Sequence, residues 1–297
     1  MIRSTAGPPE SAVPPPAAGA TLARVGQARR AVIPRWSSAP HRRSVPASDT
    51  PELQVVVRPA ESIYRASGDL QSGTFRGRWH FSFDSYWDPN HTNFGNLRVL
   101  NDDTLSPGAV WPLHPHRQNE VVTYVAAGEF RHEDEHGLGG VLHQGGVQHT
   151  TVGSGMYHSE INNRPDVRLR FIQLWFFPEA LDLPPSVEQR EVDRSERTNR
   201  WLPVVSSRHP GALPLRADAT VLASSLAYVE SIPYELTGGR GLYVYVLEGG
   251  PVTVAGERVD ALSAAEIRGA GIVDTSAERH AELLLVDVNL SKAMPAK

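Results

Sequence analysis

Two short patterns, His114-X-His116 and His158-X-Glu160, constrain this chain more than any other feature. In a β-strand, residues two apart point to the same face, so each pair can direct both of its side chains to one point. Three imidazoles and one carboxylate are metal ligands by type. The patterns therefore predict two strands that hold a metal inside a β-barrel.

The rest of the sequence also favours strands. From residue 52 onward, short runs rich in β-branched and aromatic residues alternate with Gly, Pro, Asn and Asp. We expect strands over residues 53–57, 79–83, 97–100, 120–125, 129–133, 168–177, 226–229, 241–247, 252–254 and 283–288. Few segments look like long amphipathic helices, so the fold class is predicted to be all-β, with barrels or sandwiches.

Composition sets the bounds on size and location. A chain of 297 residues with 40% hydrophobic content can form two domains with separate cores. The absence of cysteine excludes disulfides and thiolate metal sites, and it is consistent with the cytoplasmic location that we predict. No run approaches the roughly 18 apolar residues that a membrane helix needs. We therefore expect a soluble protein.

Residues 1–50 differ from the rest of the chain. They contain eight prolines and seven arginines, but only two acidic residues, Glu10 and Asp49. Such a segment cannot bury a core, and we interpret it as a disordered tail or a misassigned start, with an organellar transit peptide as the alternative. Without it the chain is clearly acidic, so direct binding to nucleic acid is not expected.

A domain boundary is predicted near residue 180. A Pro-containing bridge covers residues 178–185, and residues 186–200 form the most charged stretch of the chain. We therefore expect one domain over residues 51–180 and a second over residues 181–297. In the second domain, short strand-like runs again alternate with turn residues.

The histidine patterns lie within spacings that are similar to the two motifs of the cupin superfamily, which consists of small β-barrels. Gly108 and Gly128 flank the first pattern, and Gly155 and Asn162 flank the second. A narrower resemblance is to the pirin family. It rests on residues 94–103 (FGNLRVLNDD), 114–117 (HPHR), 123–125 (TYV) and 153–160 (GSGMYHSE).

The resemblance implies two cupin (jelly-roll-like) β-barrels packed face to face, with one mononuclear metal in the N-terminal barrel. Its ligands would be His114, His116, His158 and Glu160. Fe(II) is expected, while the ligand types also suit Ni, Co, Cu or Zn. Residues 241–249 (GLYVYVLEG) resemble the first cupin motif without its histidines, so the second barrel is predicted to be free of metal.

Other residues are assigned by their place in these motifs. Glu160 and Glu120 are candidate catalytic carboxylates, and Glu120 is expected to orient a ligand histidine. Four further histidines lack the paired spacing and are not assigned to the metal: His132, His136, His143 and His149. The chain departs from the pirin pattern at Gln118, Asn119 and His149, which predicts a more polar pocket mouth. His149 either lies near the site or points outward from its strand.

The resemblance leaves the function open between different classes of protein. We predict a dioxygenase of the quercetinase type, which acts on a flavonol or another enediol-like phenol. The alternative is a regulatory protein whose metal controls binding to a protein partner without turnover. A degenerate cupin with neither role is the third interpretation.

Overall fold

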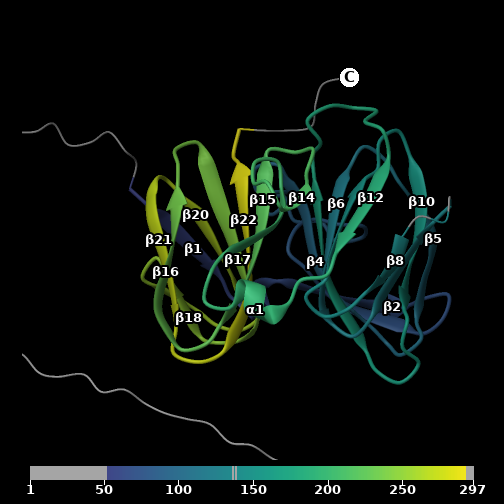
Figure 1. Cartoon of the computed structure of the whole chain (residues 1–297), viewed down its shortest axis with the longest axis horizontal. Coiled ribbons are helices and arrows are strands. Elements are labelled where there is room, and N and C mark those ends of the chain that lie inside the picture. Colours follow the sequence, from purple (N-terminus) through teal and green to yellow (C-terminus); the bar gives the residue numbers. More distant parts are fainter. Residues whose placement is uncertain (1–51, 136, 138, 292–297) are drawn as a thin grey trace, which may run out of the picture. The chain divides into compact units, whose positions relative to one another are not determined.

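The described part of the chain is almost entirely β-structure. The computed structural model describes residues 52–135, 137 and 139–291, so the predicted tail over residues 1–50 lies outside it. Within this part the helical elements are the 3-10 helix η1 (Ala60–Ser62) and the short helix α1 (Arg194–Arg197), while all other regular elements are strands (Figure 1). The predicted all-β class is confirmed.

The first half forms a seven-stranded sheet and a four-stranded sheet. The larger sheet has the spatial order β12 (Ser186–Arg190), β9 (Val147–Thr151), β6 (Glu120–Ala127), β11 (Leu169–Phe176), β4 (Leu97–Leu105), β3 (Thr74–Trp79) and β2 (Tyr64–Asp69). The smaller sheet has the order β5 (Val110–His116), β10 (Met156–Asn162), β7 (Phe130–Asp134) and β8 (Gly139–Leu142).

The second half has the same construction. Its larger sheet has the order β1 (Gln54–Arg58), β20 (Ala264–Arg268), β17 (Arg240–Gly249), β22 (Ala281–Asn289), β15 (Ala219–Leu226), β13 (Leu202–Ser206) and β14 (Leu213–Pro214). Its smaller sheet has the order β16 (Val229–Leu236), β21 (Gly271–Ala277), β18 (Val252–Val254) and β19 (Glu257–Val259). Position by position, β16 is therefore the counterpart of β5, and β22 is the counterpart of β11.

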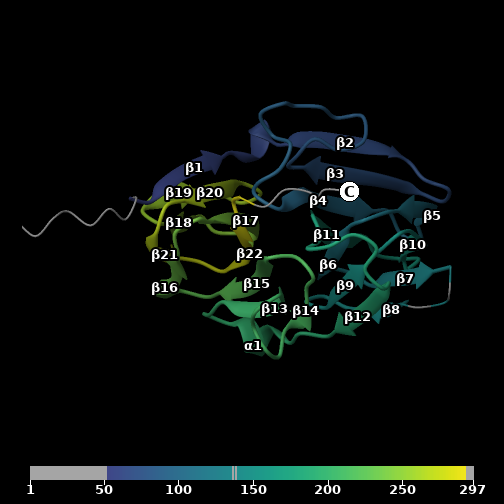
Figure 2. The same ribbon diagram turned by 90° about the horizontal axis from the view of Figure 1, so that it is seen from above.

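Each half donates one edge strand to the other. β1, from the start of the described chain, pairs with β20 in the second half, and β12, which follows residue 180, pairs with β9 in the first half (Figure 2). These two pairings cross the boundary predicted at residue 180, which stays a prediction. The exchange joins the two barrels by backbone hydrogen bonds as well as by side-chain packing.

A shared core lies between the two seven-stranded sheets. It contains Val122, Ile172 and Leu174 of the first half together with Val221 and Leu284 of the second half, all of them buried. Because both faces of the central strands are covered, strands such as β6 and β15 are buried along nearly their whole length. This packing confirms the expectation of two barrels that face each other.

Two predicted strands are wrong in their positions. β3 ends at Trp79, and the chain then turns at Asp84, which has a positive φ of 47°. Residues 226–229 were expected to form one strand, but they contain the end of β15 and the start of β16. Residues 79–83 alternate as a strand would, and residues 226–229 form an apolar run, so in both places the hydrophobic pattern alone does not indicate the break in the strand.

Among the described residues, no helix is long and apolar enough to cross a membrane.

Candidate metal centre

Each histidine pattern lies on a strand, as predicted, and the two strands are adjacent. His114 and His116 are on β5, and His158 and Glu160 are on β10, which pairs with β5 in antiparallel register. His158 lies opposite His114, and the register shifts between His158 and Glu160. Such a β-bulge is common beside functional sites because it re-aims side chains.

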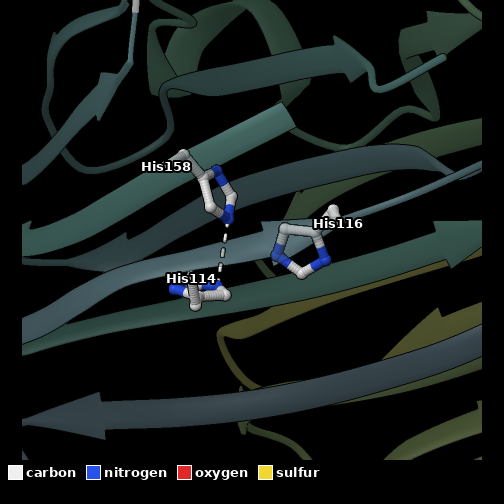
Figure 3. A group of neighbouring side chains, drawn as sticks. All are labelled: His114, His116 and His158. Carbon is white, nitrogen blue, oxygen red and sulfur yellow. Dashed lines mark hydrogen bonds between the residues drawn. The ribbon is translucent and has the colours of Figure 1, made fainter. Parts of the chain in front are cut away.

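The structure brings His114, His116 and His158 together. One ring nitrogen of each lies within 4.8 Å of the others, and His116 and His158 are buried. Figure 3 shows the three rings pointing toward one another. Nε2 of His158 lies 3.1 Å from Nε2 of His114. Two nitrogens bound to one metal at about 2.1 Å would lie roughly 3 Å apart at a right angle, so this separation suits a shared ion.

The hydrogen bonds of these rings also fit a metal. His114 Nδ1 donates to the carbonyl oxygen of Pro112 at 2.8 Å, which leaves the lone pair on Nε2. His116 Nε2 is buried and has no hydrogen-bond partner among the described residues. A cation would satisfy both nitrogens, whereas without it a buried acceptor stays unpaired at a cost of about 1–3 kcal/mol.

The lowered pKa values of the three imidazoles also favour metal binding. Burial lowers the pKa of His114, although its bond to Pro112 opposes this shift. Burial, reinforced by the neighbouring histidines, lowers the pKa of His116 to about 3 and that of His158 further. The rings are therefore neutral at neutral pH, which is the form that binds metals.

Glu160 lies on β10, two residues after His158, and is outside the group that the three histidines form. Its side chain is buried, and burial raises its pKa to about 7 even though a bond from Gln173 opposes the shift. Gln173 Nε2 donates to Glu160 Oε1, and Gln173 Oε1 accepts from Trp175 Nε1 at 2.7 Å. The centroid of the Trp175 ring lies 4.7 Å from the centroid of the His116 ring. This chain of contacts orients the carboxylate.

His132 was not assigned to the site from the sequence, yet it contacts a predicted ligand. Its Nε2 lies 2.8 Å from Nδ1 of His158, because β7 pairs with the other edge of β10. Of the other unassigned histidines, His143 pairs at the surface with Glu191 at 2.9 Å. His136 lies outside the described residues.

Glu120 is not brought to the histidine group. It shares a face of β6 with Val122 and Tyr124, which pack in the core between the two halves. There its Oε2 accepts from His149 Nε2 at 2.6 Å and from the backbone N–H of Arg216 at 3.1 Å. The expectation that Glu120 orients a ligand histidine is not supported by these contacts, and its catalytic role stays a prediction.

His149 therefore matches neither predicted alternative: it does not lie near the three histidines, and its side chain does not point into solvent. It is buried, with its Nδ1 3.5 Å from Glu188 in addition to the bond to Glu120. Gln118, another of the three departures from the pirin pattern, exchanges hydrogen bonds with Asp182, at 2.5 Å to its carboxylate and 2.9 Å from its backbone N–H. Gln118 thus ties the end of β5 to the turn at residue 182.

A cavity of about 340 Å³ with aromatic walls is lined by Trp111 and Pro112, which precede His114 on β5, although none of the three histidines lines it. Phe75, Trp79, Phe83 and Trp111 line it. The Trp111 ring lies 6.4 Å from that of His114, and Phe83 contacts Trp175 at 5.2 Å between ring centroids. Flat aromatic molecules pack well against such walls.

Comparison with known proteins identifies the family of the chain. Residues 62–176 match the family model described as Pirin, and residues 204–288 match that of the quercetinase C-terminal cupin domain. A pirin-like protein of Caulobacter vibrioides is 37% identical over 222 residues, which is 74% of this chain and 95% of that protein. A quercetin 2,3-dioxygenase of Escherichia coli K12 is 31% identical over 211 residues, which is 71% of this chain and 90% of that protein.

A solved structure agrees with these relatives. The bacterial pirin YhhW from Escherichia coli, in complex with nickel(II), has a TM-score of 0.72 and 28% sequence identity. The match covers 80% of this chain and 99% of that chain. Since the Caulobacter relative exceeds 30% identity over nearly its whole length, the chain belongs to the pirin family.

Proposed function

We propose that this chain is a metal-dependent dioxygenase of the quercetinase type, which acts on a flavonol or another enediol-like phenol. The observation that carries the proposal is the group of His114, His116 and His158, in which one ring nitrogen of each converges and the buried Nε2 of His116 has no hydrogen-bond partner among the described residues. Relatives support it, since one is named quercetin 2,3-dioxygenase and a bacterial pirin contains nickel(II).

We propose one mononuclear divalent metal at this place. His114, His116 and His158 would hold it, with Glu160 as the fourth ligand. Imidazole with one carboxylate suits Fe(II), which we expect, and also Ni, Co, Cu or Zn. When bound, the metal supplies Lewis acidity that favours the deprotonated form of the phenol.

The protein side chains have separate tasks in this proposal. Glu160 accepts the proton of the phenol, because it is a buried carboxylate two residues from His158 on β10, and Gln173 holds its Oε1 in place. The cavity lined by Trp79, Phe83 and Trp111 receives an aromatic ring and excludes water from it. Glu120 contacts none of these groups in the described structure, so the proton is assigned to Glu160.

Anaerobic binding of a flavonol tests the proposal without turnover. Quercetin added to the metal-loaded protein should show the absorption shift of a chelated flavonolate, with one equivalent bound per metal. The same titration with His116→Ala should show no shift. A metal-loaded wild-type protein that binds no flavonol and shifts no absorption band would refute this substrate class.

A further inference from the structure

The second barrel contains a cavity of about 630 Å³, separate from the proposed metal ligands. Its walls include residues of β13, β15, β16 and β22. In strand order, β16 and β22 are the counterparts of β5 and β11, which carry His114 and Trp175 at the metal centre. The second barrel therefore has a cavity at the counterparts of β5, which carries His114 and His116, and of β11, which carries Trp175.

The floor of this cavity is apolar. Leu222 of β15 and Ile232 of β16 are 2% and 7% exposed, and both face it. Trp201 and Pro203 extend the apolar wall toward the opening. A volume in the hundreds of Å³ with such a lining is typical of sites for small organic molecules.

One side of the cavity is polar, and Asp287 organises it. Asp287 Oδ2 accepts from Arg208 Nη2 at 2.8 Å and from the Tyr234 hydroxyl at 2.6 Å. Its Oδ1 accepts from Arg240 Nε at 2.5 Å. Because two guanidinium groups offset its charge and its oxygens are engaged, Asp287 is not available to a cationic ligand.

Arg208 is the group that remains available to a ligand. Its side chain is 41% exposed, and only Nη2 has hydrogen-bond partners, namely Asp287 and Thr220, among the described residues. Of its other donors, Nη1 can give a charge-assisted hydrogen bond to a ligand carboxylate. Arg200 adds a second positive charge to the lining, against one exposed carboxylate, that of Glu235.

We propose that this cavity binds a small aromatic carboxylate. Its carboxylate would pair with Arg208, and its ring would lie against Trp201, Leu222 and Ile232. Asp287 acts as the positioning residue, since it fixes Arg208 and Tyr234 at the polar side. The proposal does not depend on the dioxygenase activity, because no metal ligand lines this cavity.

Calorimetric titration of the full chain with benzoate tests this site. Benzamide and benzylamine serve as neutral and cationic probes with the same ring. Benzoate should bind at least tenfold more tightly than either, and Arg208→Gln should weaken it about tenfold, since one charge-assisted hydrogen bond and its positive charge are lost. Arg131→Gln is the matched control, because Arg131 is equally exposed and paired with Glu133 in the other barrel.

Two further variants test the site independently of Arg208→Gln. Arg200→Gln should weaken benzoate severalfold, and it removes bonds only to the backbone oxygens of Ser195 and Glu196, so it tests the site if Arg208→Gln fails to fold. Benzoate binding should persist in His114→Ala, because the metal centre is not involved. No binding up to about 10 mM, equal binding of benzamide, or loss of binding in His114→Ala would each overturn the proposal.

Discussion

Nε2 of His132 lies 2.8 Å from Nδ1 of His158, while Nε2 of the same His158 ring lies 3.1 Å from that of His114. One nitrogen of His158 is thus held by the neighbouring strand β7, and the other points to the proposed metal. A partner on the far nitrogen fixes the tautomer and the orientation of a ligand imidazole.

His132→Ala should therefore weaken metal binding without abolishing it. Loss of such a supporting group typically costs about 10- to 100-fold in metal affinity. Competition with a chromophoric chelator measures this change. His143→Ala, which alters a surface histidine paired with Glu191, should leave the affinity unchanged. Equal affinities of the His132→Ala and wild-type proteins would contradict the role of His132.

The pair of His149 and Glu120 predicts a pH dependence of stability. Burial lowers the pKa of His149, but the Glu120 and Glu188 carboxylates outweigh this effect, so the net shift is upward. A raised pKa in the folded state stabilises the protein fully below the unfolded value of about 6.5, and this stabilisation is lost as pH rises through the folded value.

The difference in free energy of unfolding between the wild-type and His149→Gln proteins should therefore shrink as the pH is raised above about 6.5. Urea denaturation of the chelator-treated proteins at several pH values measures it. His143→Gln, at an exposed position, should give a difference that does not change. A constant difference for His149→Gln would show that His149 does not carry the charge.

Asp102 lies outside the metal centre, but we expect it to contribute strongly to the free energy of unfolding. It accepts two hydrogen bonds from Arg170, at 2.8 and 2.7 Å, and one from the Tyr245 hydroxyl of the second half at 2.5 Å. Asp102→Ala leaves a largely buried guanidinium unpaired, which we expect to cost about 3 kcal/mol of the free energy of unfolding.

Chemical denaturation of Asp102→Ala and Asp260→Ala compares this buried pair with a surface pair. Asp260 pairs with Arg258 where both are more than 60% exposed, so its removal should change stability by less than about 1 kcal/mol. Similar effects of the two substitutions would show that the Asp102 network contributes little.

The aromatic cavity predicts a defect in substrate binding for Trp111→Ala. Loss of one ring wall should weaken flavonol binding about tenfold, because an aromatic pair contributes roughly 0.5–1.5 kcal/mol beyond its buried area. Trp87→Ala is the control, since Trp87 is 71% exposed and does not line the cavity. Unchanged flavonol affinity in Trp111→Ala, with the metal retained, would place the substrate elsewhere.

The sequence could place His114 and His116 on one face of a strand because strand alternation is local. The spacing of His114 and His116 is enough to place both on one face of β5, and the register with β10 brings His158 opposite His114. His132 was missed because its contact depends on which strand covers the other edge of β10. Partner choice between strands is not visible in residue spacing.

The face of Glu120 could not be predicted for a related reason. Both faces of β6 are buried, so apolar residues occupy both and the pattern does not distinguish the barrel interior from the core between the halves. The exchange of β1 and β12 was missed because each strand is short and its sequence suits either barrel. These features depend on tertiary packing.

Oxygen uptake tests the central claim most directly. The full chain is loaded anaerobically with Fe(II), and separately with Ni(II), and oxygen consumption is measured when quercetin and other enediol-like phenols are added. We predict uptake that scales with bound metal and vanishes in His114→Ala. Full metal occupancy with no oxygen uptake for any of these phenols would contradict the assignment as a dioxygenase.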